Sequence, residues 1–186
     1  MELKERVLEA ALEEFNEKGM KFTMDDVSRR LSISKRTLYL VVKDKEDLFK
    51  TSIDYVYAKI KEEERKIADD SSLGTLEKLE KLLIAMPPEY QSLDFRKIAE
   101  IQSRYPLLYK RIEENIESQW ETTIALIHQA EQEGLIREVN IPVFKTMFSA
   151  TIEYYLTRSV LKEANMSYEE GLKDMLDLLM NGIIVK

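Results

Sequence analysis

The chain of 186 residues contains no cysteine and a single histidine. Without cysteine it can form no disulfide, no thiolate metal site and no cysteine nucleophile. The lone His128 has no second histidine and no cysteine with which to bind a metal or to form a catalytic pair. We therefore expect no catalytic residues, no metal site and no cofactor, and we do not expect an enzyme.

Glycine and proline are also scarce, with 5 and 4 residues, so strands and hairpins would lack their usual turn residues. The apolar content of 44% is sufficient for a packed core, and an all-α fold is the best expectation. No apolar run approaches the ~20 residues that a membrane span needs, and the charged start lacks the apolar segment of a signal peptide. We expect a cytoplasmic protein with no membrane partner.

The net charge of −7 is unevenly distributed. Residues 1–50 hold 11 basic and 11 acidic side chains, so the excess of acidic charge lies entirely in residues 51–186. Within the first part, residues 28–50 carry 7 basic and 3 acidic side chains. A locally basic surface on an otherwise acidic protein is consistent with binding to a polyanion such as DNA.

Three short helices are predicted in the first 42 residues. Apolar residues recur at spacings of three and four along residues 2–18, which predicts an amphipathic first helix. Thr23 is placed to cap a second helix. After a turn at Ser32 and Ile33, Ser34 is placed to cap a third helix that runs to about residue 40. This arrangement is typical of a helix-turn-helix head.

Six longer helices are predicted after the head, which gives about nine in all. The first should connect the head to the rest of the chain, and we interpret its charged run, residues 59–66, as a solvated face. The last two are too apolar to bury only one side, which favours a four-helix bundle with a second copy of the chain. The six predicted helices cover residues 44–68, 75–86, 93–104, 107–133 and 140–164, and from 167 onward.

Several short motifs in residues 7–49 resemble the TetR family of bacterial transcriptional regulators. The order of the later helices is also similar to that family, but it carries no specific motif. The residues that carry the resemblance are Ala10–Ala11, Phe15, Lys18–Gly19, Thr23–Val27, Ile33–Lys35, Thr37–Tyr39 and Lys43–Leu48.

The resemblance implies a helix-turn-helix DNA-binding domain over residues 1–48 and a helical effector-binding and dimerisation domain over residues 49–186. It further implies a homodimer that binds a pseudo-palindromic operator in double-stranded DNA, usually as a repressor, and that responds to a small-molecule effector whose identity the sequence does not give. Carried onto this chain, the residues expected to contact DNA are Thr23, Ser34, Lys35, Arg36, Thr37, Tyr39, Lys43 and Lys45.

Two further sets of residues follow from the expected second domain. For the effector pocket we select aromatic and methionine residues of the middle helices, although ordinary core packing accounts for any single one of them better than ligand binding does. The pocket candidates are Met86, Tyr90, Phe95, Tyr105, Trp120, Met147, Phe148 and Tyr155. The candidates for the dimer interface are Ala150, Tyr154, Leu161, Leu172, Met175, Leu179 and Ile183.

The head departs from the family pattern at four positions. Ser32 and Arg36 stand where glycine is commoner, and a left-handed Ser32 would be strained by about 1 kcal/mol. Val41 and Val42 replace the usual aromatic or histidine residues, so a different set of DNA contacts is expected. Two alternatives stay open: a TetR-like architectural DNA-binding protein, and a helical ligand-binding module without effector-controlled transcription.

Overall fold

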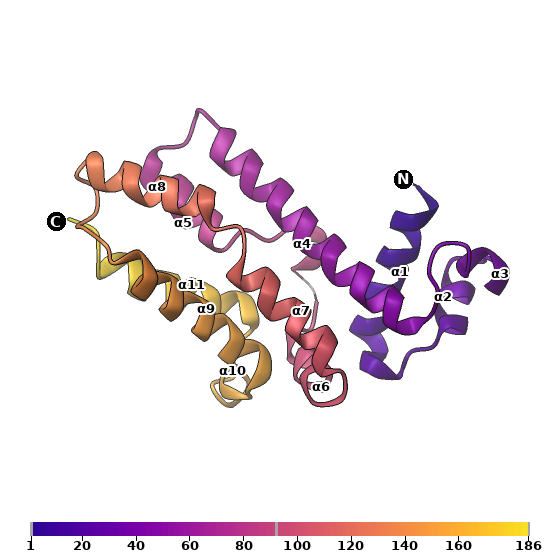
Figure 1. Cartoon of the computed structure of the whole chain (residues 1–186). Helices are drawn as coiled ribbons and strands as arrows, with labels where there is room; N and C mark the ends of the chain where they lie inside the picture. Colours follow the sequence, from indigo (N-terminus) through magenta and orange to yellow (C-terminus); the bar gives the residue numbers. More distant parts are fainter. Residues whose placement is uncertain (1, 92, 186) are drawn as a thin grey trace.

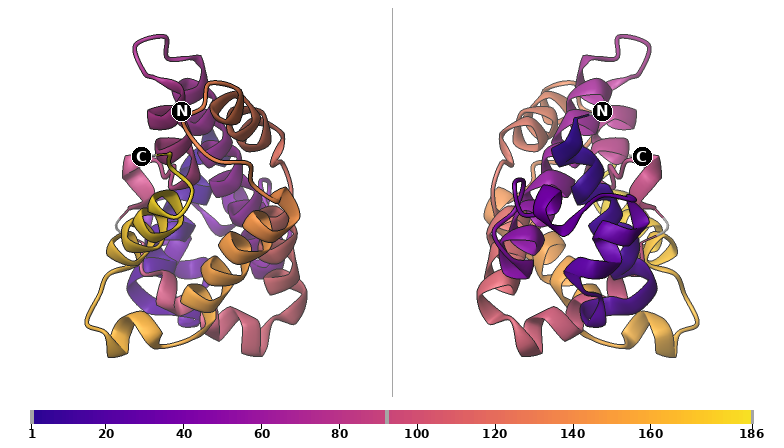
Figure 2. Two further views of the ribbon diagram at one scale, coloured as in Figure 1. Left: turned by 90° about the vertical axis from the view of Figure 1, so that its left-hand side faces the viewer. Right: turned by 90° about the vertical axis from the view of Figure 1, so that its right-hand side faces the viewer.

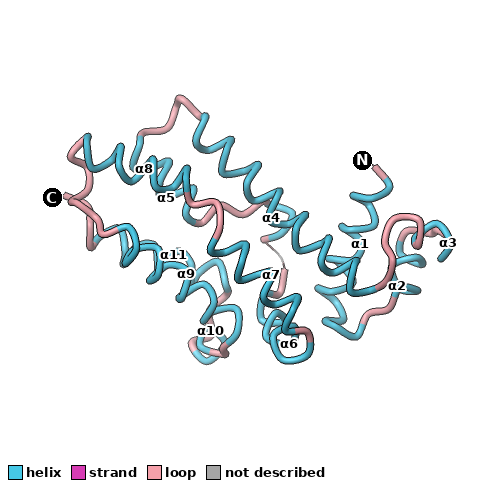
Figure 3. Tube along the Cα trace, in the orientation of Figure 1, coloured by secondary structure: helices cyan, strands magenta, loops and turns pink. Residues whose placement is uncertain are grey.

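The computed structural model describes residues 2–91 and 93–185. In this part of the chain the regular structure is helical, apart from one isolated antiparallel bridge between Ile136 and Ile184, and Figure 3 shows helices joined by loops. The all-α prediction is therefore confirmed. The α-helices are α1 Leu3–Lys18, α2 Met24–Arg30, α3 Lys35–Leu38, α4 Lys45–Asp69, α5 Thr75–Leu83, α6 Ile98–Arg104, α7 Pro106–Glu117, α8 Glu121–Gln132, α9 Ile141–Thr157, α10 Val160–Glu163 and α11 Tyr168–Asn181. The 3-10 helices are η1 Gly19–Lys21, η2 Pro88–Tyr90 and η3 Phe95–Lys97.

The molecule is elongated, with helices α1, α2 and α3 forming a head at one end (Figure 1). The long helix α4 starts in the head and runs toward the other end, where α5 and α8 pack against each other. Helices α9 and α11 lie side by side on the body of the molecule, and both face the viewer when it is seen from the end opposite the head (Figure 2). The connecting role predicted for α4 is confirmed.

Five helices start at capping residues, and the caps at Thr23 and Ser34 are those predicted above. The side chains of Thr23, Ser34, Asp44, Asn140 and Ser167 each accept a hydrogen bond from the backbone N–H three residues later. Such caps satisfy N–H groups that have no partner inside the helix, and each stabilises its helix by about 1 kcal/mol. They fix the helix starts locally, which is why the sequence alone locates them.

The single helix predicted over residues 107–133 is wrong, because the chain breaks between α7 and α8. Gln119 there has a positive φ of 59°. The indole of Trp120 donates to the carbonyl oxygen of Ile116 at 3.0 Å, in the place of a helical backbone N–H. Lys145 reaches from α9 to the carbonyl of Glu117 at 2.6 Å. Side-chain donors thus satisfy the carbonyls at the end of α7, so the break leaves few backbone groups unpaired.

The helix predicted over residues 140–164 is also wrong, because α9 ends at Thr157 and the short α10 follows separately. The turn between them buries Leu161 against α11. A Cβ atom placed on Gly171 would lie 2.6 Å from the Leu161 side chain, so the glycine allows this close approach. The gain from burying Leu161 offsets the interruption of the helix.

The remaining differences are shifts of boundaries. Helix α3 ends at Leu38 and α5 at Leu83, each two or three residues earlier than predicted, and the helix predicted from residue 93 begins with η3. The described residues contain eleven α-helices rather than about nine, two of which have only four residues. None of these changes alters the order of the elements.

A candidate DNA-binding surface and a central cavity

The turn between α2 and α3 presents α3 on the surface of the head. Ser32 adopts the left-handed conformation with φ 54°, at a position where glycine is commoner in the family pattern. The Ile33 N–H donates to the Ser28 carbonyl at 3.0 Å, which closes the turn. Ser34 accepts from the Thr37 N–H at 3.0 Å, and the two hydroxyls lie 2.8 Å apart. Both hydroxyls therefore serve the start of α3.

Helix α3 displays basic and aromatic side chains to solvent. Lys35 and Arg36 are exposed, and half of Tyr39 is accessible. The Lys35 ammonium lies 2.7 Å from the carboxylate of Asp25 in α2, and this hydrogen bond raises the pKa of Lys35. Arg36 makes no ion pair within the described residues. An exposed cation pair beside a helix N-terminus suits a phosphate backbone.

Two of the residues predicted to contact DNA are already used inside the head. The Thr23 hydroxyl donates to Asp26 at 2.7 Å and accepts from its N–H, so it caps α2. The Lys45 ammonium donates to the Met20 carbonyl at 2.6 Å and lies over the Phe22 ring. Burial lowers the pKa of Lys45. The structure thus uses the Lys45 ammonium within the head, and its contact with DNA stays a prediction.

The segment after α3 holds a residue that the sequence analysis missed. Leu40 is 79% exposed, directly beside Tyr39, whereas Val41 is half-buried and Val42 is in the core. Lys43, also predicted to contact DNA, is exposed. A leucine exposed just after a helix that enters the major groove can make apolar contacts to thymine methyl groups there. Exposure is a tertiary property, and no sequence motif marks it here.

A buried carboxylate joins α1 to α2 within the head. Glu14 is 4% exposed and lies 2.7 Å from both the Lys18 ammonium and the Arg30 guanidinium. Burial acts to raise the pKa of Glu14, but the hydrogen bonds from Lys18 and Arg30 outweigh it and hold the pKa below its ordinary value. Arg30 also pairs with Glu13 and Glu17. The head is thus fixed as a unit behind α3.

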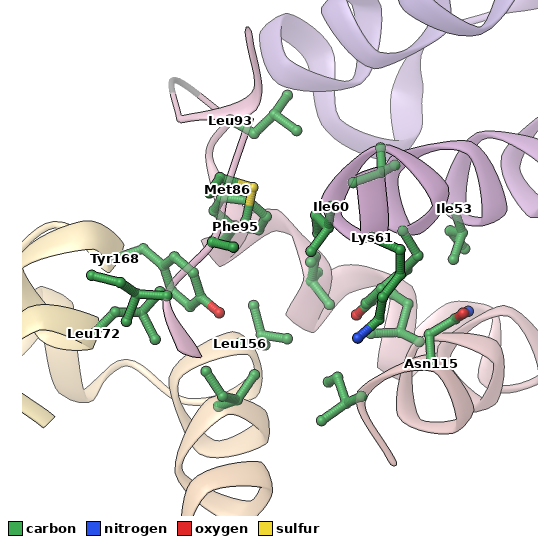
Figure 4. A pocket seen from close by; sticks show the side chains of 18 of the residues that line it. Ile53, Ile60, Lys61, Met86, Leu93, Phe95, Asn115, Leu156, Tyr168 and Leu172 are labelled. Atoms are coloured by element: carbon green, nitrogen blue, oxygen red, sulfur yellow. The ribbon is translucent and has the colours of Figure 1, made fainter. Parts of the chain in front are cut away.

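A cavity of about 210 Å³ lies in the middle of the chain. Its wall is mostly apolar and comes from helices α1, α4, α5, α6, α7, α8, α9 and α11 (Figure 4). Tyr168 and Leu172 of α11 lie on one side of the cavity, and Lys61 and Asn115 lie on the other. A dry apolar cavity of ~150 Å³ is already sufficient to bind benzene, so this one can hold a small apolar ligand.

The cavity reaches the head. Leu12 and Phe15 of α1 and Phe49 of α4 line its wall, and all three lie at the junction of head and body. The rings of Phe15 and Phe49 meet edge to face at 5.5 Å, and Phe49 also contacts Phe22. A ligand in the cavity would therefore touch side chains that also pack the head.

The loop and short helices after α5 connect the cavity to the head by hydrogen bonds. The Tyr90 hydroxyl donates to Glu9 of α1 at 2.9 Å, and the Asp94 N–H donates to Asn16 at 2.7 Å. Glu100 of α6 accepts from the Met20 N–H at 3.4 Å. Asp94 also lines the cavity. One segment therefore contacts both the ligand space and the base of the head.

A second hollow, of about 180 Å³, adjoins the first. The two share a wall that includes Phe95 and Tyr168, whose rings stack with centroids 4.5 Å apart. The second hollow adds Gln91 and the exposed pair Glu169 and Lys173. It extends the hollowed space toward exposed residues at the start of α11.

The predicted pocket residues fall into two groups. Met86, Phe95, Trp120 and Phe148 line the cavity, and Trp120 packs edge to face on Phe148 at 5.5 Å. The other four are absent from its wall: Tyr90 is buried against Glu9, Tyr105 and Tyr155 are half-buried elsewhere, and Met147 is 52% exposed. Periodicity identifies apolar positions, but it does not distinguish a cavity wall from solid core.

One end of the cavity is polar, and here the prediction of a solvated face on α4 fails. The side chains of Lys61 and Glu64 are only 23% and 13% exposed, and both line the cavity. The junction of α7 and α8 covers them, since Lys61 donates to the carbonyl of Gln119 at 3.0 Å. The other charged residues of this run are more exposed and form pairs three residues apart, such as Lys66 with Glu63.

An apolar stripe on α9 is exposed to solvent. Val143, Met147 and Tyr154 are each more than half exposed and, with Ala150, follow the spacing of one helix face. Leu178 of α11 is 76% exposed. Four residues predicted for the dimer interface do not lie on this surface and are corrected: Leu161, Leu172, Met175 and Ile183 are buried within the chain, while Leu179 is half-buried.

Two features are absent from the described residues, 2–91 and 93–185. No helix there is both long and apolar enough to cross a membrane. No group of three or more histidine, cysteine, aspartate or glutamate side chains is arranged there to hold a metal ion.

Comparisons with known proteins agree with this geometry. The sequence model described as "Bacterial regulatory proteins, tetR family" matches residues 7–51. The chain is 28% identical over 178 residues to YvaF of Bacillus subtilis (strain 168), named an uncharacterized HTH-type transcriptional regulator, with 96% of this chain and 94% of that protein covered.

Solved structures share the fold. The fatty acid degradation regulator FadR from Bacillus halodurans superposes with a TM-score of 0.71 at 18% identity, covering 95% of this chain and 94% of that one. FadR from Bacillus subtilis in complex with stearoyl-CoA gives a TM-score of 0.66 at 21% identity, covering 96% and 98%. The helix-turn-helix head thus matches the model of the tetR family of bacterial regulatory proteins over residues 7–51, and the whole chain is similar in sequence to an HTH-type transcriptional regulator and in fold to solved regulators.

Proposed function

We propose that the chain is a repressor that binds its operator as a homodimer and is released when a small, largely apolar molecule occupies the central cavity. The observation that carries this proposal is the wall shared by cavity and head, formed by Leu12, Phe15 and Phe49. A ligand that fits the cavity better in one head orientation than in another must shift the population toward that orientation.

For operator binding, we propose that α3 enters the major groove. Arg36 and Tyr39 are its exposed side chains without an ion pair, so they are assigned to base edges and phosphates, and Leu40 is added as an apolar contact. Lys35 and Lys43 are assigned to phosphates. Two heads in a dimer would read half-sites about 34–36 Å apart or a multiple of that spacing.

For dimerisation, we propose the exposed stripe of α9 together with Leu178 of α11. Contiguous exposed apolar surface of this kind is a common mark of a protein interface. Ala150, Tyr154 and Leu179 of the original prediction stay in this proposal, and Val143 and Met147 join them. Symmetry requires that the same surface serve both copies.

The second domain is assigned to ligand binding rather than catalysis, with residues 1–48 as the DNA-binding domain and 49–186 as the effector and dimerisation domain. That FadR of Bacillus subtilis was crystallised with stearoyl-CoA supports a ligand with a long apolar part in this fold. Action on chromosomal DNA goes with a cytoplasmic location. The alternative, an architectural DNA-binding protein without an effector, would not require the cavity.

Fluorescence anisotropy with the DNA upstream of its own gene tests the proposal. Wild-type protein should bind this DNA in preference to a scrambled sequence, and the double variant Lys35→Ala/Arg36→Ala should lose that preference. A matched control is Lys66→Ala/Lys81→Ala, which removes two exposed basic residues from helices outside the head. Equal loss in both double variants would show that only net charge matters and would refute the assignment of α3.

A further inference from the structure

The polar end of the cavity is built around one ammonium group. The Lys61 nitrogen lies 2.9 and 2.7 Å from the two carboxylate oxygens of Glu64, and 3.0 Å from the backbone oxygen of Gln119. All three neighbours are hydrogen-bond acceptors, and an ammonium has three donors. The acceptors converge on the Lys61 nitrogen. Figure 4 shows the Lys61 side chain extending from α4 beside the cavity.

The surroundings of this point favour positive charge. Glu64 is largely buried, and burial raises its pKa while the Lys61 ammonium opposes that rise. A buried carboxylate without a cation is costly, so this position must hold a cation or a proton.

Aromatic rings continue the same environment along the cavity. Trp120 follows Gln119 directly, and Tyr57, Phe148 and Tyr168 also belong to the wall. The face of an aromatic ring attracts cations, most strongly for tryptophan, and the Trp120 ring already has the Lys145 ammonium 5.8 Å from its centroid. The cavity therefore combines a long apolar wall with one end suited to a cationic group.

From this geometry we propose that the effector is a lipophilic organic monocation, with an ammonium-type head that replaces Lys61 between Glu64 and Gln119 and an apolar part that fills the cavity. The inference rests on the proposed effector role of the cavity and assigns its ligand class. The Lys61 side chain is on a flexible stem and already 23% exposed, so it can turn to water when the ligand's cation takes its place.

The same contacts disfavour an anionic head. Every donor of Lys61 faces an acceptor in the protein, so none is left for a carboxylate ligand. An anion at this end would also lie beside Glu64, and two like charges in a poorly solvated site repel. A neutral ligand would gain the apolar contacts but not the charge-assisted hydrogen bonds.

The test uses three probes of equal chain length and different charge: decylammonium, decanol and decanoate, each below its micelle-forming concentration. Trp120 is the only tryptophan and lines the cavity, so its fluorescence reports occupancy directly. Wild-type protein should bind decylammonium at least about tenfold more tightly than decanol, and decanoate more weakly than decanol.

Three variants locate the effect. Glu64→Gln should bring decylammonium to within about threefold of decanol, and a melting temperature no lower than that of wild type would show that the fold is intact. Glu62→Gln is the matched control, because Glu62 is exposed on the same helix and is absent from the cavity wall, and it should behave as wild type. Lys61→Met removes the competing ammonium and should tighten decylammonium binding.

Three outcomes would each overturn the proposed ligand class. They are equal binding of the three probes, no binding of any probe, and a preference for decanoate that Lys61→Met abolishes. These outcomes are separable from failure of the proposed function, which is measured on DNA. If decanol releases the protein from the operator as well as decylammonium does, the regulatory role stands and the cationic class falls. If decylammonium binds selectively but the protein has no operator, the cationic ligand class stands and the regulatory role falls.

Discussion

The ion pair between Asp25 and Lys35 offers a sensitive test of the DNA-binding surface. The carboxylate in the first turn of α2 lies 2.7 Å from the Lys35 ammonium, with side chains 49% and 62% exposed. Asp25 thus neutralises a cation next to the recognition helix and adds a negative charge of its own where phosphates would approach. We predict that Asp25→Asn tightens operator binding.

The size of the effect follows from counterion release. Each phosphate neutralised by a lysine adds about 0.9 to the slope of log K against log salt concentration, so freeing Lys35 in both heads of a dimer adds up to about 1.8. Over a fourfold range of salt concentration, this slope corresponds to about a tenfold difference in affinity. The variant should therefore bind more tightly at low salt and lose the advantage as salt rises.

Anisotropy titrations at several salt concentrations measure both quantities. Glu77→Gln is the matched control, since Glu77 forms an equally exposed 2.7 Å pair with Lys81 outside the head. In a Lys35→Ala background, Asp25→Asn should have little further effect, because its action passes through Lys35. Unchanged or weaker binding by Asp25→Asn, at an unchanged melting temperature, would refute the placement of Lys35 at the DNA.

Four other predictions address the rest of the molecule. Ser34→Ala removes the cap of α3 and should cost about 1 kcal/mol, seen as a small drop in melting temperature with a larger loss of operator affinity. Ser52→Ala removes a buried hydroxyl without a partner from the cavity wall and should raise the melting temperature by about 2–4 °C, as scanning calorimetry would measure. Met147→Glu places a charge in the exposed stripe of α9 and should give monomers by light scattering at micromolar concentration, whereas a persistent dimer would exclude that surface. Burial raises the pKa of Glu64, so the folded chain keeps a proton on this carboxyl at pH values where the unfolded chain has lost it. The contribution of Glu64 to the free energy of unfolding is therefore lowest above the folded pKa and rises as pH falls toward 4.5. Urea titrations should show that the stability gained by Glu64→Gln shrinks over the same pH range.

The helix starts and the head could be predicted from sequence because their causes are local. A cap at Thr23 or Ser34 acts within three residues, and the left-handed turn at Ser32 follows from its position between two helices. The breaks after α7 and α9 have no such local mark. Gln119 and Arg158 are neither glycine nor proline, and the breaks exist because distant side chains satisfy the freed carbonyls or fill the space beside them.

The candidate cavity was harder to predict than the DNA-binding surface. Lys61 and Glu64 belong to a charged run whose other members are more exposed, and the sequence does not indicate that the α7–α8 junction covers these two. Similarly, Lys45 resembles a surface cation until the structure shows it bonded to the carbonyl of Met20. In each case the decisive contact joins residues at least 25 positions apart, which periodicity and capping rules do not report.

The wall between cavity and head limits how such a protein can diverge. A substitution of Phe15 or Phe49 that reshapes the cavity also repacks the base of the head. Under the proposed function, a change of ligand specificity at these residues therefore alters operator affinity as well. The opposite end, around Lys61 and Trp120, is joined to the body of the molecule instead. Under the proposed function, new ligands can be accommodated most freely at that end, while the aromatic wall beside the head links cavity occupancy to release of DNA.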